Sequence, residues 1–266
     1  MPREVTAFSN STVKLLRSLR DKKARRAEGL FLAEGLRILT EARDSGRLPE
    51  IVAFSAEGAR HPLAAEIIAA TEAAGGDAVE TTPDILSKMS GKDNPQMLLG
   101  AYGQPDTGLE RIDRSAAPLW IVAQALRDPG NIGTILRTGD AVGAGGLILI
   151  DDCADPFSVE AVRASMGAIF TQQVALARWE EFLPWLRSGP GQLVGTSLKA
   201  TDDYLDARYE PPCFLLIGNE QQGLPQSYEA ECDLLVKIPM AGRADSLNAA
   251  MAAAVMAFAV KASWRN

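Results

Sequence analysis

The second half of the chain alternates apolar runs with helical patterns, and this alternation limits its fold more than any other feature. Strand-like runs lie at 119–126, 146–150, 172–177, 192–198, 214–218 and 234–239. Helical patterns lie at 131–142, 158–169, 179–188 and about 247–262. Strands that are apolar along their length are typical of a parallel sheet covered by helices on both faces. The sequence therefore predicts an α/β fold with its ligand site at the carboxyl ends of the strands.

The first hundred residues carry a shorter set of the same signals. Strand-like runs lie at 29–35, 51–54 and 96–103, and helical patterns lie at 10–19, 36–46, 61–76 and 83–91. The stretch 104–117 contains proline and charge without an apolar period, which is typical of a linker. We therefore expect a small α/β domain over 1–103, a linker over 104–117 and a larger domain over 118–266.

Charge is distributed unevenly along the chain. The formal net charge is −7, yet residues 10–26 carry seven lysines and arginines against one aspartate. An acidic chain is a poor general nucleic-acid binder, whereas a local basic helix suits contact with phosphates. An ordinary solvated helix face is the alternative. The candidate RNA contacts are Lys14, Arg17, Lys22, Lys23, Arg25 and Arg26.

Other features disfavour secreted, membrane and metal-binding proteins. The N-terminus has no apolar core of the kind that a signal peptide needs, and the apolar run 249–260 is too short to span a bilayer. Three cysteines without a C-x-x-C pair suggest neither a disulfide framework nor a zinc site. His61 is the only histidine, so a mechanism with a histidine base has one candidate. We expect a cytoplasmic protein with no membrane segment and no metal.

The segment 127–150 has the outline of a dinucleotide-binding loop. It reads as a strand end, a glycine-rich turn, a helix and a second strand, with Asp151 where the fingerprint has an acidic residue. A G-x-G-x-x-G pattern would nevertheless place Asp128 at its first glycine, where a carboxylate would face the pyrophosphate. No G-K-[ST] follows, which excludes a Walker loop. The phosphate chemistry therefore disfavours a nicotinamide site.

Polar residues at the start of this helix indicate a different kind of site. Asn131 lies where a helix N-cap is expected. Arg137 follows Gly133 by four residues, so its side chain would pass over that glycine toward the ligand end of the sheet. A guanidinium there suits a phosphate or a developing oxyanion. A salt bridge to Asp128 or Asp140 is the alternative reading.

Two later segments also place glycines and polar residues after strands. The strand at 214–218 runs directly into Gly218 and Gly223, and glycine just past a strand end lets the backbone approach a ligand. The segment 236–260 passes through an irregular loop to an alanine-rich helix, with Ser246 as the expected N-cap. Such a helix permits close packing within the chain or against a second subunit. No single segment specifies a reaction.

Three ordered motifs run through these segments. They are N-x-G-x-x-x-R at 131–137, G-N-E-x-x-G-L at 218–224, and I-P-M followed by S-L-N at 238–240 and 246–248. Together they resemble the SpoU (TrmH) family of S-adenosylmethionine-dependent RNA ribose 2′-O-methyltransferases, in the SPOUT superfamily, and the likeness covers 119–260. A shorter likeness, at 28–42, is to the ribosomal-protein-like substrate-binding domain that many members carry in front.

The resemblance implies features that periodicity does not show. It implies a C-terminal SPOUT domain with a parallel sheet and a deep trefoil knot, a small N-terminal α/β RNA-binding domain, and a homodimer with the active site beside the subunit interface. The residues carried over to cofactor binding are Thr196, Ser197, Ile217, Gly218, Asn219, Gly223, Ile238, Met240 and Leu247. The residues carried over to catalysis or substrate positioning are Asn131, Arg137, Glu220, Ser246 and Asn248. The expected substrate is rRNA; the alternatives are tRNA, methylation of a base, and a non-catalytic RNA-binding protein of the same fold.

The chemistry that the resemblance implies is in-line attack of a ribose 2′-hydroxyl on a sulfonium methyl group. The protein must then orient the hydroxyl and manage its proton. Because an arginine is effectively always protonated, we expect Arg137 to clamp the adjacent phosphate and stabilise the forming alkoxide, rather than to act as the base. Arg243 stands in a loop where many relatives have a second glycine, and it is a further candidate for contact with RNA or a partner subunit.

Overall fold

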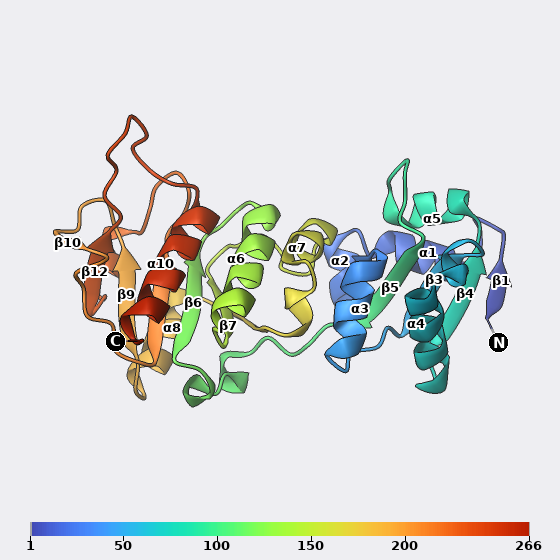
Figure 1. The fold of residues 1–266 in the computed structure, drawn as a ribbon, viewed down its shortest axis with the longest axis horizontal. Coiled ribbons are helices and arrows are strands. Elements are labelled where there is room, and N and C mark those ends of the chain that lie inside the picture. The colour runs from blue at the N-terminus through green and yellow to red at the C-terminus, as the bar shows by residue number, and fades with distance from the viewer. Residues whose placement is uncertain (1, 266) are drawn as a thin grey trace. The chain divides into compact units, whose positions relative to one another are not determined.

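The computed structural model describes residues 2–265 and divides the chain into two compact units (Figure 1). The first unit contains the residues up to Pro105 together with Asp155–Thr171, and the second contains Asp106–Ala154 and the residues from Gln172 onward. Each unit is built on its own sheet. Within residues 2–265, no helix combines the length and apolarity that a membrane span requires.

The first unit has a five-stranded sheet. Its strands are β1 (Arg3–Val5), β2 (Leu30–Glu34), β3 (Ile51–Ser55), β4 (Asp77–Thr81) and β5 (Leu98–Gly103). They lie in the order β1-β4-β3-β5-β2, with β5 antiparallel to both neighbours and the other pairs parallel. The three expected strands are present as β2, β3 and β5. The strand β1 was not expected, because three residues are too few to show a period.

Helices cover both faces of this sheet. They are α1 (Ser11–Ser18), α2 (Lys22–Glu28), α3 (Leu36–Asp44), α4 (Pro62–Ala73), α5 (Pro83–Ser90) and α7 (Val159–Ser165), with 3-10 turns η1 (Gly58–Arg60) and η4 (Ala168–Phe170). Leu16 of α1 and Met89 of α5 pack into one core beneath the sheet. The basic region is two helices where one was expected. Asp21 separates them, because its carboxylate accepts from the Lys23 amide at 2.8 Å and so caps α2.

The segment Asp155–Thr171 packs with the first unit, although it is expected in the 118–266 domain. The ring of Phe31 on β2 lies 5.3 Å from that of Phe157 and 5.7 Å from that of Phe170, measured between centroids. Asp155 also forms an ion pair with Arg25, whose side chain is 3% exposed. Aromatic contacts and a buried ion pair therefore draw this segment away from its neighbours in sequence.

The second unit has a seven-stranded sheet in which all neighbours are parallel. Its strands are β6 (Leu119–Gln124), β7 (Gly146–Ile150), β8 (Gln173–Ala177), β9 (Gln192–Thr196), β10 (Asp202–Asp203), β11 (Cys213–Ile217) and β12 (Leu234–Lys237). Their order is β10-β12-β9-β11-β6-β7-β8. This confirms the predicted parallel α/β sheet and its six apolar strands. The seventh, β10, is two aspartates with no apolar signal.

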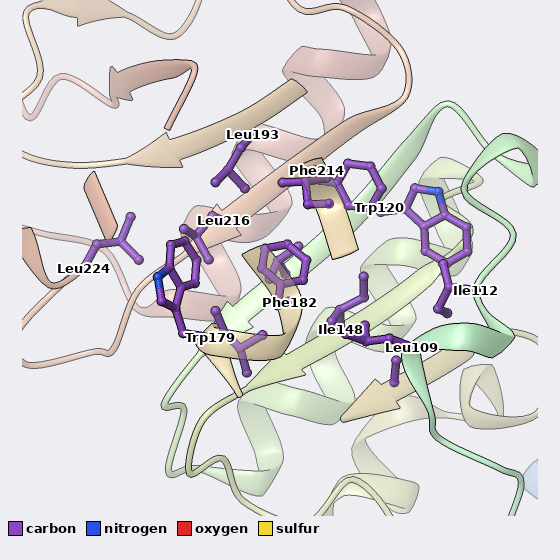
Figure 2. Close-up of a cluster of buried hydrophobic side chains, with 14 of the residues drawn as sticks. Leu109, Ile112, Trp120, Ile148, Trp179, Phe182, Leu193, Phe214, Leu216 and Leu224 are labelled. Atoms are coloured by element: carbon purple, nitrogen blue, oxygen red, sulfur yellow. The ribbon is translucent and has the colours of Figure 1, made fainter. Parts of the chain in front are cut away.

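Helices also pack on the sheet of the second unit. They are α6 (Pro129–Val142), α8 (Trp179–Arg187), α9 (Gln226–Glu229) and α10 (Ala249–Ser263), with 3-10 turns η2 (Leu109–Arg111) and η3 (Arg114–Ala116). The helices α6 and α10 pack against each other, as Figure 1 shows. Trp120, Phe182 and Phe214 are fully buried in a core between α8 and the sheet (Figure 2). Burial of each such side chain stabilises the fold by about 1.5–3 kcal/mol.

Two helices begin at residues other than those expected. Asp128, not Asn131, is the N-cap of α6, and its carboxylate accepts from the Gly130 amide at 2.7 Å. Asn248, not Ser246, is the N-cap of α10, and its side-chain oxygen accepts from the Ala250 amide at 2.9 Å. Asp128 accepts from one of the amides that the first helical turn leaves unpaired, and Asn248 accepts from two. The amide group of Asn131 is thereby free for other contacts.

Candidate active site

Three neighbouring strands of the second unit end around one cavity. The loops after β9, β11 and β12 line it, and its volume is about 300 Å³. Parallel strands place their carboxyl ends at the same edge of a sheet, which is why residues so far apart in the sequence meet here. All the residues carried over to cofactor binding line this cavity: Thr196, Ser197, Ile217, Gly218, Asn219, Gly223, Ile238, Met240 and Leu247.

The loop after β11 folds closely against its own backbone. A side chain at Gly218 would place its Cβ 2.5 Å from the carbonyl carbon of Gly223, so only glycine fits there. The Oδ1 of Asn219 accepts from the Gln221 amide at 2.9 Å, and its Nδ2 donates to the carbonyl of Ala125 at 2.8 Å. Asn219 thus holds the loop in shape and ties it to the end of β6.

A chain of three hydrogen-bonded side chains lies at the same edge. The Nδ2 of Asn131 donates to Oε1 of Glu220 at 2.8 Å, and the Nδ2 of Asn248 donates to Oδ1 of Asn131 at 3.1 Å. The three residues come from α6, the loop after β11 and the start of α10. Asn131 is 8% exposed, so it forms the fixed centre of the chain. Three of the five residues expected for catalysis are therefore in direct contact.

The other two expected catalytic residues are placed differently. Ser246 lines the cavity from an exposed loop, and its hydroxyl donates to Oδ1 of Asp245 at 3.1 Å. Arg137 is exposed on α6 and is not one of the described residues that line the cavity. Its guanidinium is accessible to a large substrate. Among residues 2–265, no group of His, Cys, Asp and Glu side chains is arranged to hold a metal ion.

The short helix α9, which follows the loop after β11, is anchored by an acidic residue. The hydroxyl of Tyr228 donates to Oδ2 of Asp151 at 2.9 Å, and its ring stacks on Trp179 with centroids 3.9 Å apart. Burial, helped by the neighbouring carboxylate, raises the pKa of Tyr228. Asp151 also accepts from Gln124 at 3.1 Å. Asp151, which stands where a dinucleotide-binding fingerprint has its acidic residue, therefore has a structural role.

Comparison with known proteins agrees with this geometry. The model of the SpoU rRNA Methylase family matches residues 118–258, and that of the MRM3-like substrate binding domain matches residues 10–100. The 23S rRNA (uridine(2479)-2′-O)-methyltransferase of Streptomyces viridochromogenes is 32% identical over 90% of this chain and 84% of its own length. The chain belongs to the SpoU rRNA methylase family.

Two further proteins match nearly the whole chain. The 23S rRNA (guanosine(2553)-2′-O)-methyltransferase RlmP of Bacillus subtilis is 27% identical over 96% of this chain and 98% of its own length. The crystal structure of an AdoMet-bound rRNA methyltransferase from Sinorhizobium meliloti is 39% identical, covers 98% of this chain and 97% of its own, and has a TM-score of 0.90. The SPOUT α/β fold expected from the motifs is thereby confirmed, while the knot stays a prediction.

The basic residues expected to contact RNA in this family member need one correction. Five of them are exposed: Lys14 and Arg17 on α1, and Lys22, Lys23 and Arg26 on α2. Arg25 is buried, and its Nη1 donates to the carbonyl of Leu19 at 2.9 Å while its other nitrogens bond to Asp155. Arg25 is therefore a structural residue and is removed from the RNA-contact set. Its partner lies 130 residues further along the chain, where no sequence pattern points to it.

Several residues that were not predicted from the sequence also line this cavity at the ends of β9, β11 and β12. Lys199, Glu229 and Asp245 add charge to its wall. Lys199 directly follows the named strand end, so a wider window around Ser197 would have found it. Glu229 belongs to α9 and is outside all three motifs. Glu229 reaches the cavity because Tyr228 and Asp151 hold α9 in place.

Proposed function

We propose that this chain transfers the methyl group of S-adenosylmethionine to a ribose 2′-hydroxyl of rRNA. The observation that carries the proposal is the hydrogen-bonded chain Glu220–Asn131–Asn248, which lies at the same strand ends as the cavity lined by every residue assigned to the cofactor. The three residues belong to the three separate motifs. Support also comes from relatives that are named as 23S rRNA 2′-O-methyltransferases.

The cavity fits the cofactor in size and in lining. Its volume of about 300 Å³ reaches the range of small-molecule sites, which begins at about 300 Å³. Ile217, Ile238 and Leu247 offer apolar walls, while Thr196 and Ser197 offer hydroxyls. The close backbone approach at Gly218 exposes peptide groups that suit a polar ligand. When bound, S-adenosylmethionine supplies an electrophilic methyl group.

The protein's own residues then orient the ribose and receive its proton. One carboxylate oxygen of Glu220 accepts from Asn131, which leaves Oε2 to accept a hydrogen bond from a 2′-hydroxyl. Asn248 fixes the amide of Asn131 from the other side. In this proposal the exposed Arg137 holds the phosphate next to that ribose, and Ser246 contacts the substrate from its exposed loop. We assign Glu220 to the proton and Arg137 to the phosphate.

The exposed face of α10 supports a homodimer. Met251, Val255 and Phe258 are 63%, 36% and 55% exposed, and their spacing of four and three residues places them on one side of the helix. A cluster of large apolar side chains on a surface marks an interaction site. We propose that α10 packs against the same helix of a second copy. The cytoplasm is the proposed location, because all three cysteines are free thiols.

A direct assay tests the proposed function. The protein is incubated with radiolabelled S-adenosylmethionine and unmodified 23S rRNA, and the product is digested to nucleosides for mass spectrometry. We expect one 2′-O-methylated nucleoside. A methylated base would replace the ribose assignment, and label in tRNA alone would favour the tRNA alternative. No label in either RNA, with intact cofactor binding, would leave a binding protein of the same fold.

A further inference from the structure

Two neighbouring strand ends of the second unit have an unusual backbone. Ala125 directly follows β6 and has a φ of 50°, and Asp151 directly follows β7 and has a φ of 62°. The two strands pair with each other in the sheet. Among residues 2–265, the only other residue besides glycine with a positive φ is Met166, which ends α7, where this conformation is common. The left-handed region costs an alanine about 1–2 kcal/mol, so it persists only where the surrounding contacts impose it.

The carbonyl of Ala125 holds the turn that contains Glu220. It accepts from Nδ2 of Asn219 at 2.8 Å. The turn is closed on itself, since the Gly223 amide donates to the carbonyl of Asn219 at 2.9 Å and Oδ1 of Asn219 accepts from the Gln221 amide, also at 2.9 Å. Glu220 lies inside this closed turn, so the position of its carboxylate depends on where Asn219 is held.

The carboxylate of Asp151 holds the flanks of the same turn. Its Oδ2 accepts from Nε2 of Gln124 at 3.1 Å and from the hydroxyl of Tyr228 at 2.9 Å. Its Oδ1 accepts from the Trp179 amide at 3.1 Å. Gln124 is the residue before Ala125, and Tyr228 lies on α9, which follows the turn. Asp151 therefore fixes the strand end that holds the turn as well as the helix that comes after it.

The contacts of both strained residues lead to the turn and not to the cofactor. Neither Ala125 nor Asp151 is one of the described residues that line the cavity. The place in the turn where position matters most is the 2.8 Å hydrogen bond from Asn131 to Glu220. A misplacement of about 1 Å at a reacting group costs about 100-fold in rate, even when its cause lies far from the chemistry. A rigid support for this turn therefore serves the reaction.

We propose that Ala125 and Asp151 are positioning residues, which hold the turn 219–223 from both sides and keep the Glu220 carboxylate in place for the ribose hydroxyl. The inference rests on the proposed function, since it takes Glu220 as the group that receives the proton. The hydrogen bonds of the two residues offset the strain of their backbone. Tyr228 belongs to the same support, although it lies outside the three motifs.

Tyr228→Phe tests the proposal in the full-length protein, because it removes one bond to Asp151 and keeps the ring that stacks on Trp179. With in vitro transcribed 23S rRNA and saturating S-adenosylmethionine, we expect kcat to be about tenfold lower. The KM for RNA and the Kd for S-adenosylmethionine should stay within about threefold. Asp151→Ala should lower kcat further. Asp151→Asn should restore most of it, because asparagine still accepts from the Trp179 amide and its Nδ2 donates to the Tyr228 hydroxyl.

Ala125→Gly tests the other residue. Glycine adopts a φ of 50° without strain and keeps the carbonyl that accepts from Asn219, but it also adopts many other conformations. The relief of strain and the loss of rigidity should nearly cancel in the melting temperature, while kcat falls about threefold or more as the turn loosens. Normal kcat here would overturn the part of the proposal that concerns Ala125.

A double-mutant cycle shows whether Tyr228 acts through Glu220. In a Glu220→Gln background, Tyr228→Phe should lower the remaining turnover by less than about twofold, because the group that it positions has lost its role. Equal effects in both backgrounds would make the bond to Asp151 merely structural and would overturn the proposal. So would a loss confined to S-adenosylmethionine affinity with normal kcat, which would assign the contacts to the cofactor.

Tyr209→Phe is the matched control, since its hydroxyl donates to the carbonyl of Tyr204 at 2.5 Å elsewhere in the second unit. It should lower the melting temperature about as much as Tyr228→Phe, yet leave kcat within about twofold. Failure of the wild-type protein to methylate any RNA would count against the proposed function. A methylating enzyme with normal kcat in both Tyr228→Phe and Asp151→Ala would count against this inference alone.

Discussion

At the scale of single residues, the carboxylate of Glu220 is the group on which the proposed chemistry most depends. Glu220→Gln keeps an oxygen that can accept from Asn131 at the observed 2.8 Å, but it removes the charge that would receive a proton. We expect turnover to fall by about 100-fold or more, the usual contribution of a positioned base. Calorimetry should show S-adenosylmethionine binding within about twofold of the wild type.

The exposed Gln226, at the start of α9 and outside the cavity lining, provides the control for this variant. Gln226→Ala should keep both cofactor binding and turnover. Near-normal turnover of Glu220→Gln would remove Glu220 from the proton transfer. Joint loss of cofactor binding and turnover would make it a residue of the cofactor loop.

Arg137 calls for a different substitution, because its proposed role depends on shape as well as charge. Arg137→Lys keeps the cation but loses the planar, five-donor group that grips a phosphate. We expect kcat/KM for RNA to fall by about tenfold or more, measured under single-turnover conditions. The equally exposed Arg127, paired with Asp152, is the control position, and Arg127→Lys should have little effect. Normal rates for Arg137→Lys would exclude any role that needs a planar group.

The three thiols predict a loss of stability at alkaline pH. Burial raises the pKa of Cys153 to about 11 and the pKa values of Cys213 and Cys232 to about 12. In the unfolded chain a thiol has a pKa near 8.5, so above that pH the unfolded state holds fewer protons than the folded state. The free energy of unfolding should therefore keep its full value below about pH 8.5 and decrease as the pH rises from there, up to about pH 11 for Cys153 and about pH 12 for the other two thiols.

Urea unfolding at pH 8 and at pH 10 measures this loss. Each thiol should lower the free energy of unfolding by about 1–2 kcal/mol between pH 8 and pH 10, since a shift of one pKa unit corresponds to about 1.4 kcal/mol. Cys153→Ala should lose less stability over this range than the wild type. Identical losses in the two proteins would show that this thiol does not contribute.

Residues in motifs were easier to predict from the sequence than contacts between distant segments. The residues assigned to the cofactor line one cavity because parallel strands bring their carboxyl ends together, and the order of the motifs supplied the rest of the prediction. Arg25 was misassigned because its ion pair with Asp155 spans 130 residues, and charge patterns carry no information at that distance. A cavity beside Tyr102 in the first unit was missed for the same reason, since its walls come from four separate segments.

At the scale of elements, strands were easier to predict than helix starts. Each of the six apolar runs predicted as strands of the second unit is a strand, because burial on both faces of a sheet demands that pattern. The start of α6 was placed too late, although Pro129 at its first position already indicated a cap at Asp128. The turn between α1 and α2 was missed because charged residues occur both in helices and in their caps. At the start of a helix several neighbouring residues are acceptable N-caps, and only the backbone geometry shows which of them is used.

The position of α7 changes what removal of the N-terminal region should do. A fragment of residues 104–266 retains Phe157 and Phe170 but loses Phe31, the ring that both contact. We expect this fragment to aggregate in size-exclusion chromatography, because it exposes apolar rings and leaves Asp155 without Arg25. The same fragment with Phe157→Ser and Phe170→Ser should be more soluble and should still bind S-adenosylmethionine.

That soluble fragment also tests the proposed division of labour between the 1–103 and 118–266 domains. RNA binding should fall far more than cofactor binding when residues 1–103 are absent. Equal loss of both would count against separate roles for the two domains. A well-behaved fragment without the serine substitutions would show that α7 does not depend on the first unit.

At the scale of the whole molecule, the apolar face of α10 predicts a dimer on which activity depends. Phe258→Glu places a charge on a side chain that is 55% exposed in the single chain, so it should cost the monomer little. In the dimer the same charge would be buried without a partner, which is expensive. Sedimentation should therefore show a dimer for the wild type and a monomer for the variant. Met97→Glu, at a 45% exposed methionine of the first unit, is the matched control and should stay dimeric. Because Asn248 caps the same helix and holds Asn131, loss of the dimer should also reduce turnover, while an active monomer would separate the catalytic residues from the interface.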